Sequence, residues 1–265
     1  MEHNLSRPIY EAGDPRVVRL SKACLWYIVL PLGWLLVQVK QAWPRTQRFI
    51  DQVPNAMSVL RIPASPVVIW ELSRAVIDNR TSTAWWWFGG LIGLVLLDGL
   101  DGPLARQLDA TSKFGKVIDP AADKVLAACL ALSYGYLVWR FQGVAVFGFV
   151  AFFIGWVIHV EIKIVQVAAE TGKVLRVLPE ADIPGANVNG KIKFTLEAVG
   201  FIAAFAMMIA DPTNKFGGYF LAATMMVARL YADRSLGRHR AELTSFKQQA
   251  SAQGIIFGDF GEDAA

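Results

Sequence analysis

Residues 81–106 read TSTAWWWFGGLIGLVLLDGLDGPLAR, an apolar run that ends in charged residues. The run Thr81–Leu97 carries no charge, and Asp98, Asp101 and Arg106 follow directly after it. Its apolar residues do not alternate with polar ones, so the pattern favours a helix over a barrel strand. A spanning helix needs roughly 20 residues, so this run must borrow a polar turn at one end to cross a membrane.

Similar runs recur along the chain. Apolar residues make up 54% of the 265 residues and charged residues only 18%, which excludes a disordered chain. Two cysteines exclude a small disulfide-rich module, and a net charge of +4 gives no support for a nucleic-acid partner. We therefore predict an all-α membrane helix bundle with six core transmembrane helices. The runs that predict them are Met57–Leu72, Thr81–Leu97, Val125–Trp139, Phe141–Ile158, Ala198–Ala210 and Phe216–Ala228.

Charged residues lie at one end of each run, and that end alternates between the start and the finish from one run to the next. Antiparallel neighbours would therefore bring all six charged ends to the same side of the bilayer. Lysine and arginine in the connecting segments are also more frequent on that side. By the positive-inside bias, we expect the charged ends on the cytoplasmic side of a bacterial inner membrane.

An additional apolar stretch, Ala23–Val39, precedes the six runs and predicts an extra N-terminal helix. Basic residues flank it evenly, so charge leaves open whether it spans the membrane, re-enters it or lies on its surface. It lacks a small-residue cleavage site where a signal peptide would have one, so we expect it to be retained. The expected regions are an N-terminal extension (residues 1–53), a membrane domain (54–234) and a polar C-terminal tail (235–265).

Four aspartates lie around the turn between the second and third predicted core helices. Asp98 and Asp101 are three residues apart and share a helix face, as do Asp119 and Asp123, which are four apart. The intervening segment 107–114 is long enough only to turn the chain. Two neighbouring helices therefore bring four carboxylates together.

Four anions at the edge of a membrane are costly, because an aspartate at mid-bilayer costs about 2.5–3.5 kcal/mol and like charges repel. A divalent cation such as Mg²⁺, Mn²⁺ or Ca²⁺ would offset this cost, since hard carboxylate oxygens are its preferred ligands. The alternative is that the aspartates only cap helices and pair with lysines, as Asp123 could with Lys124. That alternative explains neither the fourfold clustering nor the glycines nearby.

Small residues accompany the aspartates. Gly102 and Gly115 would let a ligand approach the backbone closely, and Ala105 keeps the face of Asp98 and Asp101 open. Each small residue taken alone is more typical of helix packing in membranes. Together with the neighbouring Arg106, the set suits a substrate that carries a pyrophosphate.

The segment Asp98–Asp123 resembles, without a gap, the signature of the CDP-alcohol phosphatidyltransferase family, D-x2-D-G-x2-A-R-x8-G-x3-D-x3-D. The resemblance extends over roughly Pro54–Arg234. It implies a transferase that joins the phosphatidyl group of CDP-diacylglycerol to an alcohol and releases CMP, with Mg²⁺ or Mn²⁺ as cofactor. It implies Asp98, Asp101, Asp119 and Asp123 as metal ligands, with Asp123 also the general base. It implies Gly102, Ala105, Arg106 and Gly115 as the lining of the CDP-lipid site.

Two further segments resemble bacterial phosphatidylglycerophosphate and cardiolipin synthases within this family. Residues 54–61, PNAMSVLR, are similar to their P-N-x-[LI]-[TS]-x-x-R segment, and residues 118–124, IDPAADK, to their L-D-P-x-A-D-K. Gly190–Thr195 resembles their G-K-x-K-T segment with Phe194 inserted, which implies Lys191 and Lys193 as ligands of an acceptor phosphate. Anchoring at the cytoplasmic surface is the alternative role for both lysines.

The fourth predicted helix departs from those relatives. Its end carries no arginine and reads VIHVEIK over residues 157–163, so Lys163 or His159 would have to substitute. We expect glycerol-3-phosphate as the acceptor, giving phosphatidylglycerophosphate. Phosphatidylglycerol, giving cardiolipin, is the second expected acceptor. The sequence leaves open whether the chain forms a homodimer.

Two other classes of protein also place carboxylates in a helix bundle. A cation channel or transporter would need polar groups continuing across the membrane, and Thr81–Leu97 and Val125–Trp139 supply almost none. A non-catalytic membrane scaffold would tolerate loss of the aspartates. Replacement of Asp123 separates both from a transferase.

Overall fold

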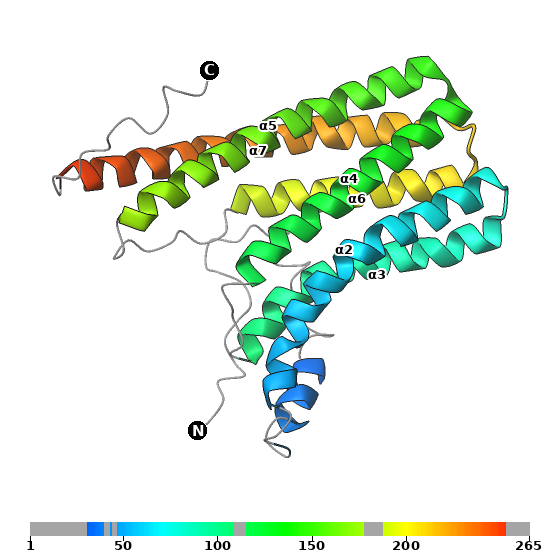
Figure 1. Cartoon of the computed structure of the whole chain (residues 1–265). Coiled ribbons are helices and arrows are strands. Elements are labelled where there is room, and N and C mark those ends of the chain that lie inside the picture. The colour runs from blue at the N-terminus through cyan, green and yellow to red at the C-terminus, as the bar shows by residue number, and fades with distance from the viewer. Residues whose placement is uncertain (1–30, 40–42, 44–46, 109–114, 178–187, 253–265) are drawn as a thin grey trace. The chain divides into compact units, whose positions relative to one another are not determined.

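The computed structural model describes residues 31–39, 43, 47–108, 115–177 and 188–252, and all regular structure in these ranges is helical. This confirms the predicted all-α class. The six long helices are α2 (Gln47–Ile77), α3 (Thr81–Gln107), α4 (Gly115–Gln142), α5 (Val144–Val177), α6 (Val188–Ala210) and α7 (Phe216–Ala252) (Figure 1). Five of the six predicted apolar runs lie within one helix each, but the run Phe141–Ile158 is divided by Gly143, so that its first two residues end α4 and the rest begins α5. Of the N-terminal stretch Ala23–Val39, residues 31–39 are helical, and the remainder lies outside the described residues.

Four of the long helices contain a segment that is long and apolar enough to cross a membrane. These segments are Thr81–Asp101, Ala121–Gln142, Val144–Val174 and Val188–Ala210, in α3 to α6. Within the described ranges, α2 and α7 do not reach this apolarity, since Arg61 and Glu71 interrupt α2 and the second half of α7 is rich in charge. The all-helical class is therefore confirmed and crossing of the membrane is supported for four helices, while the count of six core transmembrane helices stays a prediction.

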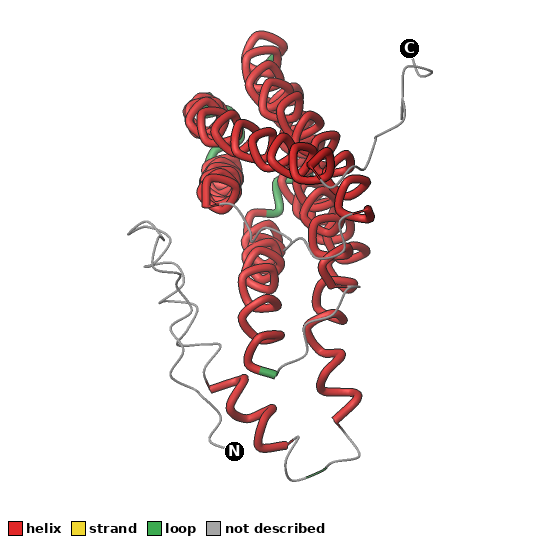
Figure 2. Tube along the Cα trace, turned by 90° about the vertical axis from the view of Figure 1, so that its left-hand side faces the viewer, coloured by secondary structure: helices red, strands yellow, loops and turns green. Residues whose placement is uncertain are grey.

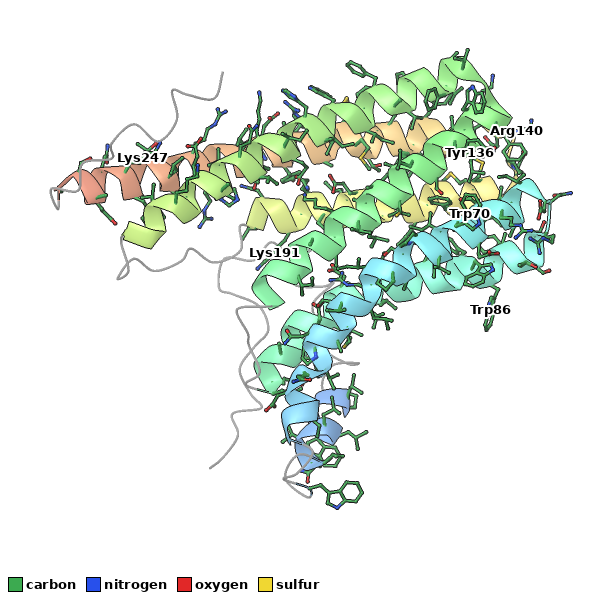
Figure 3. The ribbon with its side chains drawn as sticks, in the orientation of Figure 1. Trp70, Trp86, Tyr136, Arg140, Lys191 and Lys247 are labelled. Carbon is green, nitrogen blue, oxygen red and sulfur yellow. The ribbon has the colours of Figure 1, made fainter. Side chains whose placement is uncertain are left out.

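Large apolar side chains lie on the outside of the helices. Trp70 of α2 is 68% exposed and Trp86 of α3 is 78% exposed, and Figure 3 shows both pointing away from the ribbon. Leu132 of α4 and Phe152 of α5 are likewise exposed. Apolar surface of this extent is typical of helices that face lipid.

The chain forms two compact units, and Figure 2 shows helices as the regular structure of the described residues of both. The first comprises Met1–Val150 and Ala198–Leu221. In it α2 contacts both α3 and α4. The α4–α5 turn is joined to the α6–α7 turn by Gln142, whose Nε2 donates to the carbonyl oxygen of Asn214 at 2.9 Å. Gly143 forms the tight α4–α5 turn at φ +89°, a conformation that disfavours other residues.

Helix α2 stays continuous although it contains Pro54, Pro63 and Pro66. An interior proline costs about 3 kcal/mol in a helix, so tertiary packing must offset it. One face of α2 is buried at intervals of three or four residues against its neighbours. This face consists of Ser58, Arg61, Ser65, Ile69, Leu72 and Val76. Packing of this face directs Arg61 into the interior of the first unit.

The second unit comprises Ala151–Glu197 and Ala222–Ala265. Its core forms where α5 and α7 pack together, in two clusters of buried apolar side chains. The first cluster contains Val160, Ala232 and Leu236, and the second contains Val174, Leu243 and Ala250. The contacts advance in the same direction along both helices, so α5 and α7 are parallel (Figure 1). Helix α7 continues to Ala252, so the expected polar tail begins as a helix.

Candidate active site

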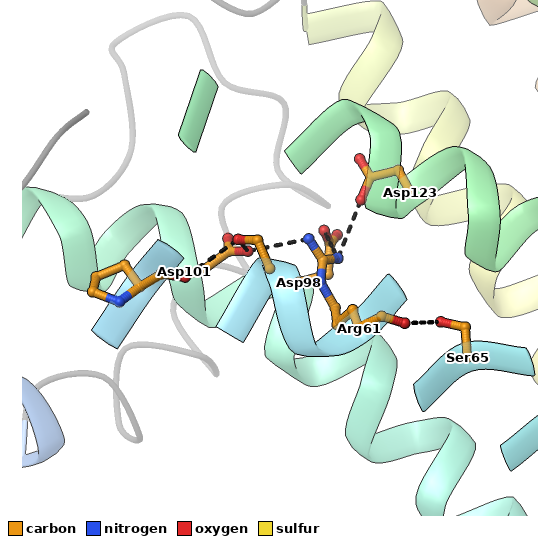
Figure 4. Close-up of polar contacts among 7 residues, drawn as sticks. Arg61, Ser65, Asp98, Asp101 and Asp123 are labelled. Atoms are coloured by element: carbon orange, nitrogen blue, oxygen red, sulfur yellow. Dashed lines mark hydrogen bonds and ion pairs between the residues drawn. The ribbon is translucent and has the colours of Figure 1, made fainter. Parts of the chain in front are cut away.

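Arg61 is the centre of an ionic cluster in the first unit. Its side chain is 0% exposed, and its guanidinium contacts carboxylates from two other helices (Figure 4). Nη1 pairs with Asp98 of α3 and lies 3.1 Å from Oδ1 of Asp123 of α4. Nη2 lies 3.2 Å from Oδ2 of Asp101 of α3. Three of the four predicted acidic residues therefore converge on one positive group.

Ser58 adds a neutral contact to this cluster. It precedes Arg61 by one helical turn, and its hydroxyl lies 2.9 Å from Oδ2 of Asp101 and 3.3 Å from the carbonyl oxygen of Pro54. A hydroxyl donates one hydrogen bond, and the contact with Asp101 is the shorter of the two. Oδ2 of Asp101 therefore accepts from both Ser58 and Arg61.

The three carboxylates differ in their access to solvent. The side chain of Asp101 is 8% exposed, that of Asp98 16% and that of Asp123 33%. Asp101 is thus the deepest member of the cluster and Asp123 the most open.

The remaining residues of the predicted site lie on the same two helices. Gly102, Ala105 and Arg106 follow Asp101 within the last turns of α3, and Gly115 is the first residue of α4. Asp119 lies one turn before Asp123 on α4. The side chains of Arg106 and Asp119 lie outside the described residues, as does the connecting segment 109–114.

The charges of this cluster are unequal. Three carboxylates surround one guanidinium, which leaves an excess of negative charge if all three are ionised. Within the described side chains, no three histidine, cysteine, aspartate or glutamate residues form a ready-made metal centre. The donor set is nevertheless made of hard carboxylate oxygens that converge on a cation, and this chemistry fits a divalent metal ion.

A second ionic cluster, in the second unit, contains one of the predicted acceptor ligands. Lys193 of α6 is buried, and its ammonium pairs with Glu161 of α5 and lies 3.5 Å from Oε2 of Glu197. Lys191 lies half-buried at the start of α6 (Figure 3), and Lys163 is half-buried on α5. The charge of Lys193 is therefore matched by two glutamates.

The family model for CDP-alcohol phosphatidyltransferases matches residues 51–231. The chain belongs to the CDP-alcohol phosphatidyltransferase family. The matched range includes both ionic clusters, with Arg61, Asp98, Asp101, Asp123 and Lys193. The family resemblance of the aspartate signature is thereby confirmed.

Curated relatives within this family fall into two groups by name. The chain is 36% identical to the chloroplastic CDP-diacylglycerol–glycerol-3-phosphate 3-phosphatidyltransferase 1 of Oryza sativa over 33% of this chain and 24% of the relative. It is 34% identical to the enzyme named CDP-diacylglycerol–glycerol-3-phosphate 3-phosphatidyltransferase of Aquifex aeolicus, over 32% and 43%. It is 31% identical to the cardiolipin synthase (CMP-forming) of Streptomyces coelicolor, over 39% and 48%. Each match spans less than half of the relative's length, and no solved structure matches the chain.

Sequence reasoning did not assign Ser58 and Arg61 to the site. Both stand in the segment PNAMSVLR, where they are three residues apart and so share a helix face. Arg61 is also a charge inside a largely apolar run, and such a residue usually faces the interior of a bundle and finds a partner there. These two signals together could have placed Arg61 beside the aspartates.

Proposed function

We propose that this chain transfers the phosphatidyl group of CDP-diacylglycerol to an alcohol and releases CMP. The observation that carries the proposal is the convergence of Asp98, Asp101 and Asp123 where α2, α3 and α4 meet. These residues belong to a signature that matches the family at all of its fixed positions. The described carboxylates of this cluster outnumber the arginine that they contact, which supports a positively charged ligand.

The proposed ligand is Mg²⁺ or Mn²⁺, held by Asp98, Asp101, Asp119 and Asp123. When bound, such an ion neutralises charge on the pyrophosphate and makes the attacked phosphorus more electrophilic. The small residues and the arginine of the signature would bind the CDP part of the lipid, where missing side chains let a ligand reach the backbone. These residues are Gly102, Ala105, Arg106 and Gly115.

Asp123 is proposed as the general base, which its position in the cluster supports. It is the most exposed of the three described carboxylates, so an acceptor hydroxyl can reach it. As the hydroxyl oxygen bonds to the phosphatidyl phosphorus, the bond from that phosphorus to CMP breaks and the carboxylate takes the proton. Ser58 and Arg61 hold the carboxylate of Asp101, which is the most buried of the three, in a fixed position.

Glycerol-3-phosphate is the proposed acceptor, with Lys163, Lys191 and Lys193 as ligands of its phosphate. The names of two of the three relatives cited above support this choice. Because Lys193 already pairs with two glutamates, it would contribute to acceptor binding by exchanging one of them for the phosphate. Phosphatidylglycerol is the second candidate acceptor, favoured by the similarity to a CMP-forming cardiolipin synthase.

The proposed setting is a bacterial inner membrane with the site on the cytoplasmic side. We propose that α2 and α7 cross the bilayer with the four apolar helices, and that residues 54–234 carry the activity. The extension 1–53 and the tail 235–265 would lie outside the transferase proper, and a homodimer stays open. The excess of lysine and arginine near the charged helix ends supports this orientation.

The deciding experiment supplies the purified protein with CDP-diacylglycerol and one acceptor at a time while CMP is measured. The panel contains glycerol-3-phosphate, phosphatidylglycerol, inositol phosphate, inositol and serine. We expect CMP release with glycerol-3-phosphate, its loss in EDTA and its recovery with added Mg²⁺ or Mn²⁺. Release with phosphatidylglycerol alone would select the second acceptor, and no release with any member would overturn the substrate assignment.

A further inference from the structure

Arg61 has surroundings that a purely structural ion pair does not need. It is wholly buried, and its two terminal nitrogens contact three carboxylates, all from other helices. Its Nε has no hydrogen-bond partner within the part of the chain that the structure describes. Among the described residues, the guanidinium thus has partners at its two terminal nitrogens and none at Nε.

The oxygens that Arg61 contacts are those that a divalent ion would need. Oδ1 of Asp123 and Oδ2 of Asp101 lie within 3.2 Å of guanidinium nitrogens, and Asp98 pairs with the same group. An arginine stays protonated in a protein, so its positive charge persists when another cation approaches. Two cations that share the same carboxylates repel each other strongly where the surroundings are of low dielectric constant.

We propose that Arg61 is the resident counter-ion of the acidic site. It holds Asp98, Asp101 and Asp123 together in the absence of a divalent ion, and it gives up carboxylate contacts when such an ion binds. The inference rests on the proposed function in one respect, that the site binds a divalent metal. It adds an internal competitor that sets how tightly that metal is held.

Ser58 gives Asp101 a second partner, which allows Arg61 to give up its contact with Asp101 when a metal ion binds. Its hydroxyl binds Oδ2 of Asp101 independently of Arg61, so this deepest carboxylate keeps a partner when the guanidinium withdraws. Asp98 and Asp123, which are more exposed, are the carboxylates freed for the incoming ion. The cluster thus contains one fixed member and two that change partner.

The test compares Arg61→Gln with the wild type by Mn²⁺ binding, followed by electron paramagnetic resonance of the free ion. Thermal unfolding is followed in parallel through tryptophan fluorescence, with and without Mn²⁺. Arg74→Gln is the matched control, since Arg74 lies on the same helix and pairs with Asp78 but is exposed. Removal of a competing buried cation is expected to tighten Mn²⁺ binding by at least about tenfold. Arg74→Gln should bind Mn²⁺ like the wild type.

The thermal measurement distinguishes a counter-ion role of Arg61 from a purely structural one. In EDTA, Arg61→Gln should melt at a lower temperature than the wild type, because the carboxylates lose their neutralising partner. Saturating Mn²⁺ should restore most of that loss. A loss that Mn²⁺ does not restore, or an Mn²⁺ affinity equal to or weaker than that of the wild type, would overturn the proposal.

Two further measurements keep the result unambiguous. If Arg61→Gln does not fold, Arg61→Lys is used; it keeps the charge but not the planar fork, so Mn²⁺ binding should tighten by about two- to threefold. An unchanged affinity in that variant would also overturn the proposal. CMP release by the wild type is measured separately. If the wild type releases CMP but the Arg61 variants bind Mn²⁺ as tightly as the wild type does, only the counter-ion role is refuted. Absence of any Mn²⁺ binding by the wild type refutes both this role and the metal part of the proposed function.

Discussion

The two ionic clusters place a buried basic residue among acids, but they differ in balance. Arg61 has three aspartate partners, none of them on its own helix, whereas Lys193 has Glu161 and, one turn away on its own helix, Glu197. Counted over these named side chains alone and with all of them ionised, the first cluster has two more negative than positive charges and the second has one more. Buried charges without enough opposite charge nearby destabilise a fold. We propose on this ground that the first cluster is the one that receives a cation.

The largest expected contrast is between Asp123→Asn and Glu197→Gln, which remove the same charge from the two clusters. Loss of a positioned general base typically lowers a rate about 10²–10⁴-fold, and we expect CMP release by Asp123→Asn to fall in that range. Glu197→Gln leaves Glu161 paired with Lys193, so its release should stay within about fivefold of the wild type. Equal losses in the two variants would show that the clusters do not differ in role.

A second contrast separates the two lysines of α6. Lys193→Gln removes the buried cation that both Glu161 and Glu197 contact and should lower the free energy of unfolding by roughly 3 kcal/mol. Lys191→Gln should cost less than about 1 kcal/mol and instead raise the KM for glycerol-3-phosphate. Thermal unfolding in detergent and acceptor titration measure the two effects. A variant of Lys191 that is as unstable as that of Lys193 would contradict the assignment.

A third, smaller contrast concerns two buried serine hydroxyls of α2, those of Ser58 and Ser73. Ser58→Ala removes a hydrogen bond to an ionised carboxylate, so it should cost about 1.5–3 kcal/mol. Ser73→Ala removes contacts to a backbone carbonyl and to Ser133, both neutral, and should cost about 0.5–1.5 kcal/mol. Ser58→Ala should also lower CMP release, because Asp101 loses the partner that fixes it. If only stability changes, Ser58 has no part in positioning Asp101.

The smallest effect is expected at Asp211, an exposed carboxylate in the turn that follows α6. Hydrogen bonds from the hydroxyl and the backbone amide of Thr213 hold the pKa of Asp211 below its ordinary value. The folded state thus favours the ionised form, and this stabilisation is present above the ordinary pKa and is lost as the pH falls through the lowered one. Asp211→Ala should lower the melting temperature slightly at pH 7, and the difference should shrink in acid below about pH 3.9. A difference that persists unchanged in acid would show that ionisation of Asp211 contributes nothing.

The helices could be predicted from the sequence because each contains a largely apolar run, interrupted by charge only in α2. Their full lengths could not. The apolar runs of α5 and α7 stop at Ile158 and Ala228 and were expected to be extended only by the charged turn that follows, yet the helices continue to Val177 and Ala252. Beyond those points Val160 and Val174 of α5 still pack against buried apolar residues of α7, while charged residues interrupt the apolar pattern of both helices. These contacts between the two helices are not visible as an uncharged run in either sequence.

The acidic site was predictable to the extent that it is local. Asp98 and Asp101 share a face of α3, and a short turn brings Asp123 of α4 beside them, so spacing alone predicts their convergence. Arg61 comes from a different helix, and its place depends on which face of α2 is buried against α3 and α4. Tertiary packing decides which face of α2 turns toward α3 and α4. The charge at the centre of the site was therefore the part that spacing did not reveal.

The parallel course of α5 and α7 has a consequence for how the polypeptide is threaded through the bilayer. In the second unit Val160 packs with Ala232, and Val174 with Ala250, so both helices leave their shared core in the same direction. A reporter enzyme fused after Val177 and another fused after Ala252 must then sense the same compartment. Opposite signals from the two fusions would mean that α6 fails to return the chain across the lipid.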